Sequence, residues 1–218
     1  MKIKWLGHSS FLLTESTGLS VLTDPYDPNM VGYGYEAQKA DIVTVSHDHD
    51  DHNFLKGVAE YKELINSIGK YEHNGIHIAG FPSCHDDRDG KLRGKNNIYK
   101  FGMDGVSICH MGDIGEACSP ELIERLIPVN VLLIPVGGNY TVDAEMAKEY
   151  VDRLMPDIVI PMHYKIKHCE LDIDKVDQFL RLFDSADITE DVDELELDRT
   201  DFDEGSNTKV VVMNRSEK

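Results

Sequence analysis

Short apolar runs separated by polar turns fill the first part of the chain. Residues 3–6, 11–14 and 19–23 form such runs, and Ser16-Thr17-Gly18 lies between the last two. The pattern predicts three strands, the last two joined as a hairpin. Residues 42–46 form another β-branched run that is too short for a helix, so they predict a buried strand. From Asn53 to Ile68 the apolar positions instead recur at helical spacing, which predicts a helix with Asn53 as its N-cap.

Strands and helices alternate in the rest of the chain. Further strands are predicted at 76–79, 97–101, 106–110, 131–135 and 157–161, with strand segments near 195 and at 210–213. Helices are predicted from Ser119-Pro120 to just before Pro128, from Thr141 as N-cap to about residue 154, and over about 172–183. This order indicates two sheets with helices on their outer faces, an α/β (α+β) sandwich rather than a doubly wound sheet. No repeat or linker divides residues 1–218, so a single domain is expected.

The composition narrows the class of protein. With 40 acidic and 22 basic residues the formal net charge is −18, which argues against a general basic surface for nucleic acid, although a nucleotide in a local pocket stays compatible. Much of the acid lies between Glu170 and Glu204, as a solvated surface or as a docking surface for a basic partner. No apolar stretch approaches the roughly 20 residues that cross a bilayer, and the N-terminus lacks a secretory pattern. A cytoplasmic protein is therefore expected.

The four cysteines have no C-x-x-C spacing, which argues against a structural zinc ribbon. Disulfides are not expected in a cytoplasmic protein. Buried free thiols are predicted at Cys84, Cys109, Cys118 and Cys169.

The densest candidate chemistry is the segment His47-Asp48-His49-Asp50-Asp51-His52, directly after the strand predicted at 42–46. Three imidazoles and three carboxylates would be costly to bury together without a cation, and a divalent metal removes that conflict. His47 and His49 project the same way if the strand continues, whereas Asp51 and His52 can face a second ion. Nitrogen and carboxylate donors suit Zn²⁺, Mn²⁺, Fe²⁺ or Ni²⁺. Taken alone, the segment could also be an exposed turn without a ligand.

Three later positions repeat this arrangement of a short apolar run followed by a ligand-type residue. They are His85, Asp113 and His163. Any one of them could be a core or surface residue. All three, in order after the first cluster, predict that metal ligands from distant segments converge.

Together these motifs resemble the sequential metal motifs of the metallo-β-lactamase superfamily. The resemblance is closest to its small single-domain branch, which includes the ascorbate-6-phosphate lactonase-like hydrolases. It runs from Gly7-His8-Ser9-Ser10 through Thr23-Asp24-Pro25 to Tyr164, and includes residues 85–87, 93–96, 110–113 and 135–138. It implies a four-layer αββα sandwich and a metal-dependent hydrolase with two divalent ions, Zn²⁺ foremost.

The resemblance also implies a role for each matched residue. The metal ligands, grouped by ion, would be His47, His49 and His85 for the first, Asp51, His52 and His163 for the second, and Asp113 as the bridge. Asp24 would orient a metal-bound imidazole through its other ring nitrogen, unless it only begins a Pro-containing turn. His8 would line the pocket or serve as a structural histidine.

Two metals would provide a hydroxide that attacks an ester, lactone, thioester or phosphodiester centre, with Asp51 or Asp113 as proton acceptor. His110 is an alternative ligand, a proton donor or a packed histidine. The candidates for substrate contact are Arg93, Lys95, Asn139 and Tyr164, with Tyr140 and Lys165 flanking the same loops. The basic pair at 93 and 95 could bind an anionic group or lie in a solvated loop.

Three alternatives to a small-molecule hydrolase are considered from the sequence: a nuclease, a flavodiiron-type protein and a metal sensor. A phosphodiesterase or nuclease of the same fold would need a recognition domain or a basic surface, and neither is visible. The flavodiiron type uses His-x-Glu-x-Asp, whereas position 49 is His. A non-catalytic metal sensor would keep the ligands without turnover, because fold alone does not imply activity. The expected partner is a small-molecule substrate rather than nucleic acid or a membrane, with a homo-oligomer left open.

Overall fold

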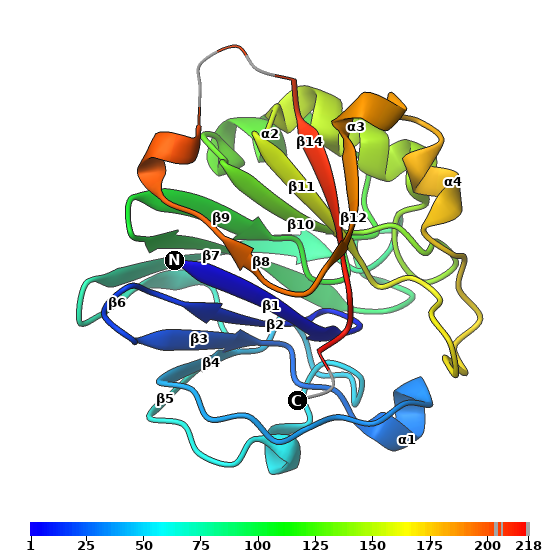
Figure 1. Cartoon of the computed structure of the whole chain (residues 1–218). Coiled ribbons are helices and arrows are strands. Elements are labelled where there is room, and N and C mark those ends of the chain that lie inside the picture. Colours follow the sequence, from blue (N-terminus) through cyan, green and yellow to red (C-terminus); the bar gives the residue numbers. More distant parts are fainter. Residues whose placement is uncertain (203–204, 206, 217–218) are drawn as a thin grey trace.

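Two β-sheets lie face to face in the computed structural model, which describes residues 1–202, 205 and 207–216 (Figure 1). The six-stranded sheet has the order β13-β1-β2-β3-β4-β5 and the eight-stranded sheet the order β12-β14-β11-β10-β9-β8-β7-β6. The first sheet contains β1 (Lys2–Gly7), β2 (Ser10–Thr14), β3 (Ser20–Thr23), β4 (Ile42–Thr44), β5 (Glu63–Ile65) and β13 (Leu195–Glu196). The second contains β6 (Gly69–His73), β7 (Ile76–Cys84), β8 (Lys95–Met103), β9 (Val106–His110), β10 (Val131–Pro135), β11 (Ile158–Met162), β12 (Ile188–Val192) and β14 (Lys209–Met213). The predicted sandwich is confirmed.

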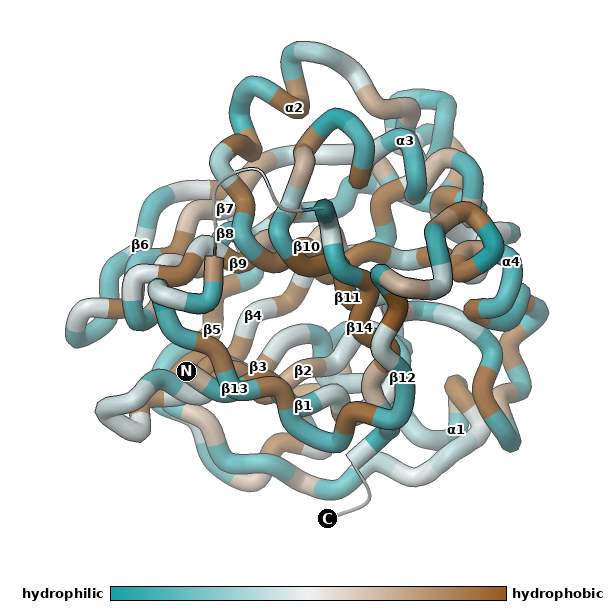
Figure 2. Tube along the Cα trace, turned by 45° about the horizontal axis from the view of Figure 1, so that its top comes forward, coloured by the Kyte–Doolittle hydropathy of each residue, from teal (hydrophilic) through white to brown (hydrophobic). Residues whose placement is uncertain are grey.

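Alternation along the first strands sends apolar side chains to both faces of the six-stranded sheet. In β1, Ile3 and Trp5 join the largest apolar cluster, whereas Leu6 joins a smaller one with Val43 and Val58. Side chains of a strand point to opposite faces, so each sheet face acquires its own apolar contacts. In Figure 2 the hydrophobic positions gather on the strands in the middle of the molecule, such as β10 and β11.

The helices that follow the early strands lie on the outer side of the eight-stranded sheet. They are α2 (Pro120–Leu126), α3 (Ala144–Leu154) and the short α4 (Asp177–Leu180), with α2 and α3 above that sheet in Figure 1. Ser119 caps α2 as its sequence signal predicts. The predicted cap Thr141 is wrong, because the side chain of Asp143 accepts the backbone N–H of Met146 and begins α3. In the described part of the chain, no helix is both long and apolar enough to cross a bilayer.

The helix predicted over 172–183 is also shorter than expected. Backbone hydrogen bonds tie Asp174 to Lys165 and to Gly137, so the start of this segment serves a loop contact and only α4 is helical.

The helix predicted over 53–68 is wrong. This segment holds a 3-10 turn (Leu55–Gly57) followed by β5, whose residues 63–65 pair in parallel with residues 42–44 of β4. Val58 is still buried, and Leu55 and Leu64 are partly buried, against the outer face of the six-stranded sheet. Pairing with a distant strand therefore overrode the local helical period. In the described residues, this segment rather than a long helix packs on that outer face. The short α1 (Pro28–Val31) lies elsewhere, because its buried Val31 packs with Tyr33, Cys169 and Ile173.

The acidic segment near the C-terminus contributes β12 and β13 to the sheet edges. Glu194 forms ion pairs with Lys2 and Lys4 at N···O distances of 3.0 Å, so part of this charge is neutralised by β1. Residues 203 and 204 of the segment lie outside the described residues.

Candidate metal centre

The residues that carry candidate chemistry follow strands that run in the same direction. β1, β3 and β4 point one way in the first sheet, and β7, β9, β10 and β11 share one direction in the second. The residues just beyond their carboxyl ends are His8, Asp24, the 47–52 segment, His85, Asp113 and His163. Carboxyl ends of parallel strands meet at one edge, which brings these distant segments together.

The side chains gather into overlapping groups whose ligand atoms lie within 4.8 Å of one another. One group is His47, His49 and His85, another is His8, Asp51, His52 and His163, and a third is His47, His52 and Asp113. The structure thus brings together every residue predicted as a metal ligand. It also places His8, predicted to line the pocket or to serve as a structural histidine, in the second group, with its Nε2 3.3 Å from Asp51 Oδ2.

Asp113 occupies the middle of the cluster. Its Oδ2 is 3.1 Å from Nε2 of His52, 3.2 Å from that of His163, 3.3 Å from that of His85 and 4.0 Å from that of His47. One carboxylate oxygen of Asp113 therefore faces four imidazole nitrogens, which belong to histidines of the first and the second of these groups.

Several of these buried polar atoms have no hydrogen-bond partner among the described residues. They include Nε2 of His47, His52 and His163 and Oδ1 of Asp113. An unsatisfied buried polar group costs free energy, and a native protein rarely leaves several of them side by side. Divalent cations would use these lone pairs, so the residues present fit a metal centre.

Burial and charge set the protonation of this cluster. Burial, reinforced by the charge of His52, lowers the pKa of His47 to about 3, which keeps its imidazole in the neutral form that binds metals. Burial alone would raise the pKa of Asp113, but His163 and His52 outweigh it and hold that pKa well below the ordinary value. The pKa of Asp51 is also lowered: burial opposes this, and the charge of His52 and the hydrogen bond from His8 outweigh it.

Asp24 contacts the ring nitrogen of His52 that faces away from Asp113. It is fully buried, and its Oδ2 is 2.9 Å from His52 Nδ1 and accepts the hydroxyl of Ser46 at 2.6 Å. Its Oδ1 accepts the backbone N–H of Ser46 at 2.8 Å. A carboxylate at Nδ1 keeps the proton there and leaves Nε2 open, which is the arrangement that orients a metal-binding histidine.

Asn96 and Gly112 position Asp113 and were not predicted individually. The side chain of buried Asn96 accepts the backbone N–H of Asp113 at 3.0 Å and donates to the backbone oxygen of Met111 at 2.9 Å. Gly112 has a φ of 55°, and a Cβ there would collide with the side chains of Asn96 and Ser46. Asn96 lies just before the strand predicted at 97–101, and its burial inside β8 is seen only in the structure, so no sequence signal identified it.

His110 does not take part in the cluster. Its Nε2 lies 2.8 Å from the backbone oxygen of Ser9, and its Nδ1 accepts the backbone N–H of Gly112 at 3.2 Å. Both ring nitrogens are thus used by the backbone in one neutral tautomer. The placement fits the packed histidine among the alternatives, and the catalytic assignment of His110 does not fit it.

The β-lactamase superfamily domain matches residues 2–163 of the chain. The chain belongs to the metallo-β-lactamase superfamily. It is 37% identical to a Thermotoga maritima protein of that superfamily, proposed to be a Zn-dependent hydrolase, with a TM-score of 0.78 and 97% of each chain covered. A UPF0173 metal-dependent hydrolase of Pyrococcus abyssi is 31% identical over 193 residues, covering 75% of this chain and 84% of that protein. A Parabacteroides distasonis protein, proposed to be a metal-dependent hydrolase, shares the fold at 19% identity and a TM-score of 0.66, over 95% of this chain and 91% of that one.

These relatives and the shared fold identify this superfamily member as a metal-dependent hydrolase. A cavity of about 270 Å³ opens onto its histidine cluster. The lining residues are Met30, His49, Asp51, His85, Arg93, Asp113, Tyr140 and Leu171. The cavity therefore combines cluster carboxylates and imidazoles with one cation and three largely apolar side chains.

Only Arg93 of the four predicted substrate contacts lines this cavity. Lys95 directs its Nζ to the backbone oxygen of Asp89 at 2.9 Å, and the side chain of Asn139 donates to the backbone of Asp172 at 2.8 Å. Tyr164 stacks on Trp5 with ring centroids 5.2 Å apart and lines a different cavity. A substrate contact by Lys95, Asn139 or Tyr164 does not fit these positions, whereas Tyr140 is a lining residue that the sequence only placed nearby.

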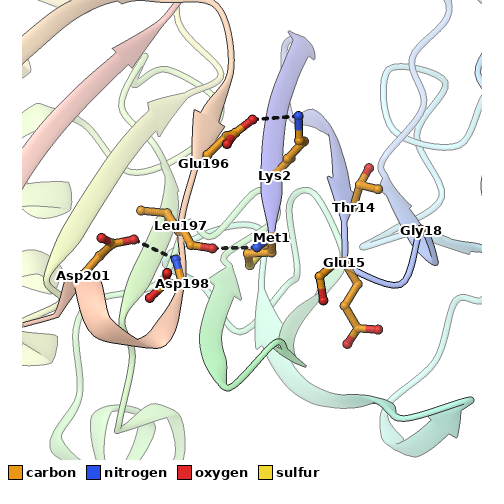
Figure 3. A pocket seen from close by; sticks show the side chains of 10 residues that line it. Met1, Lys2, Thr14, Glu15, Gly18, Glu196, Leu197, Asp198 and Asp201 are labelled. Carbon is orange, nitrogen blue, oxygen red and sulfur yellow. Dashed lines mark hydrogen bonds and ion pairs between the residues drawn. The ribbon is translucent and has the colours of Figure 1, made fainter.

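A larger cavity of about 530 Å³ lies around the N-terminus, at the opposite end of β1 from His8. Figure 3 shows the carboxylates of Glu15, Glu196 and Asp201 around it, with the backbone of Leu197 accepting the amino group of Met1. Six residues of strand separate the two regions by about 20 Å. None of the described residues that line this cavity is a histidine, and the cavity is not part of the metal centre.

All four cysteines are free and buried, as predicted.

Proposed function

We propose that this hydrolase uses two divalent ions to cleave an ester, lactone, thioester or phosphodiester bond of a small substrate. The observation that carries the proposal is the position of Asp113, whose Oδ2 faces imidazoles of both ligand groups at 3.1–4.0 Å. A single-metal site would not need a carboxylate between two sets of donors.

We assign the ligand residues to the two ions according to the groups of side chains that lie close together. The first ion is assigned to His47, His49 and His85, the second to Asp51, His52 and His163, and the bridge to Asp113. The imidazole and carboxylate mixture suits Zn²⁺, with Mn²⁺, Fe²⁺ and Ni²⁺ as the other candidates. His8 supports the second set by holding Asp51 through its Nε2.

When bound, the ions would supply a hydroxide at neutral pH and polarise the oxygen of the scissile group. Asp51 and Asp113 both line the cavity and are the candidates to accept the proton of the attacking water. Asp24 keeps His52 in the tautomer that exposes Nε2. No serine or cysteine nucleophile is required, and the four thiols are buried.

The cavity of about 270 Å³ is close to the lower end of the size range of ligand pockets, roughly 300 Å³, and this favours a small-molecule substrate. The net charge of −18 disfavours nucleic acid as the substrate. A cytoplasmic location and a homo-oligomer stay predictions.

The first test measures metal and turnover together. Purified protein should contain up to two transition-metal ions by elemental analysis, and His49→Ala should lose at least one of them. His77→Ala, which removes an exposed histidine on β7, is the matched control and should keep its metal. Equal metal in all three proteins would contradict the ligand assignment.

The second test is a panel of lactones, thioesters and phosphodiesters with the metal-loaded protein. Turnover of one bond class that His49→Ala loses and His77→Ala keeps is the expected result. No turnover with any class, despite stoichiometric metal, would contradict the proposed reaction and favour a metal-binding sensor.

A further inference from the structure

The loop between β7 and β8 joins the metal centre to the only cation that lines its cavity in the described residues. His85 and Arg93 stand at the two ends of this loop, and the backbone N–H of His85 donates to the oxygen of Gly94 at 3.1 Å. Both side chains line the same cavity. Their relative position is therefore fixed by the loop backbone.

The carboxylate of Asp86 organises this loop from inside. Its Oδ1 accepts the backbone N–H groups of Arg88 and Gly90 at 2.8 and 2.9 Å, and its Oδ2 accepts those of Leu92 and Arg93 at 2.9 and 2.8 Å. Four charge-assisted hydrogen bonds to one side chain hold the backbone in one arrangement. Asp86 directly follows a cluster histidine, so it couples the position of Arg93 to that of the metal centre.

The guanidinium of Arg93 is held in place but keeps most of its donors. Its Nη2 donates to the backbone oxygen of Asn139 at 3.2 Å, and its Cζ lies 5.7 Å from the centroid of the Tyr140 ring. Among the described residues no carboxylate lies within ion-pair distance of it. A guanidinium has five N–H donors in a planar fork that matches a carboxylate or a phosphate.

The other walls of the cavity outside the cluster are Met30, Tyr140 and Leu171. They come from α1 and from two separate loops, and they offer apolar surface. A ligand that reaches from the cluster to Arg93 would pass along these side chains.

We propose, building on the hydrolase function above, that Arg93 binds an oxyanion group of the substrate while Met30, Tyr140 and Leu171 contact its apolar part. The substrate class is then a small amphiphilic molecule with a carboxylate or phosphate at one end and the hydrolysable bond at the metal centre. Asp86 is a positioning residue for this contact.

The test measures binding rather than turnover, by calorimetry on the metal-loaded protein. The anionic probes are 3-phenylpropionate and 2-phenylethylphosphonate, and the neutral probe with the same phenylethyl group is 3-phenylpropanamide. Wild-type protein should bind at least one anionic probe about tenfold or more tightly than the amide, as expected for charge-assisted bidentate contacts. The preferred anion distinguishes a carboxylate substrate from a phosphate one.

Three variants separate the contact from general effects. Arg93→Gln should abolish the preference for the anion, and Asp86→Asn should reduce it while affinity for the amide stays unchanged. Arg88→Gln removes an exposed cation of the same loop and should match wild type. If Arg93→Gln keeps the preference, the anion is held elsewhere and the inference is overturned. A wild-type protein without any preference overturns it as well.

The result of the probe-binding experiment does not depend on whether the protein hydrolyses a substrate of the panel. Absence of hydrolysis in the substrate panel would contradict the proposed function without altering probe binding. Loss of charge preference only in Arg93→Gln and Asp86→Asn would support this contact even then.

Discussion

Replacing Asp24 with Asn tests whether the carboxylate behind His52 controls metal binding. The substitution keeps the size of the side chain but turns one acceptor into a donor. Asp24 now accepts from Ser46 N–H at 2.8 Å and from Ser46 Oγ at 2.6 Å, and it lies 2.9 Å from His52 Nδ1. If the amide oxygen stays with the backbone N–H, the amide nitrogen faces His52.

A donor at that position stabilises the tautomer in which Nδ1 is unprotonated and Nε2 carries the proton. That tautomer blocks the nitrogen that faces Asp113 at 3.1 Å. In the reverse amide orientation, the amide nitrogen faces the backbone N–H of Ser46, so two donors point at each other. In either orientation one charge-assisted hydrogen bond, worth about 1.5–3 kcal/mol, is lost. We expect metal affinity to fall about 10–100-fold in Asp24→Asn, which corresponds to about 1.4–2.7 kcal/mol.

The assay is metal competition against a chromophoric chelator at fixed pH. Asp41→Asn is the matched control, because Asp41 also accepts a serine N–H and hydroxyl, those of Ser20, at the other end of the β3–β4 pair. Asp41→Asn should lower the free energy of unfolding but leave the metal dissociation constant unchanged. The reasoning is refuted if Asp24→Asn binds metal as tightly as wild type, or if both variants lose the same affinity.

Two further results are expected. Gly112→Ala should lose about 1–2 kcal/mol of stability from its left-handed φ of 55° and should also lose bound metal, because its Cβ displaces Asn96. Gly18→Ala, at a φ of 91° with open space around it, should show only the strain in urea unfolding, and equal metal loss in both variants would contradict the packing argument. Burial raises the pKa of the Cys109 thiol from 9.0 to about 12, so stability should fall as pH rises above 9, where only unfolded thiols ionise. Iodoacetamide at pH 8 should label this thiol only after denaturation, and fast labelling of the native protein would contradict its burial.

The metal centre could be predicted from the sequence because its evidence is local. Residue types that ligate metals follow short apolar runs at four places, and each run overlaps a strand of the structure, although β7 continues to Cys84, beyond the end predicted at residue 79. The resemblance to the metallo-β-lactamase superfamily then grouped those positions by ion. The structure brings the same positions together, with Asp113 between the groups.

The side chains around the cluster could not be assigned in this way. His110 and Tyr164 are next to ligand positions in the sequence, yet His110 bonds to the backbone of Ser9 and Tyr164 stacks on Trp5. The direction of each side chain depends on partners that are distant along the chain. Proximity in sequence is therefore a weak guide to contact with a substrate.

The sequence by itself determined the strand-forming runs, the ligand types and their order, because hydrophobic periodicity and donor chemistry are properties of neighbouring residues. Only the tertiary structure decided that residues 63–65 pair with β4 instead of continuing a helix, and that Asp86 holds Arg93 at the cavity. Strand pairing and buried hydrogen bonds join residues far apart in the chain, and their free energy exceeds the small local preferences that a sequence pattern reports.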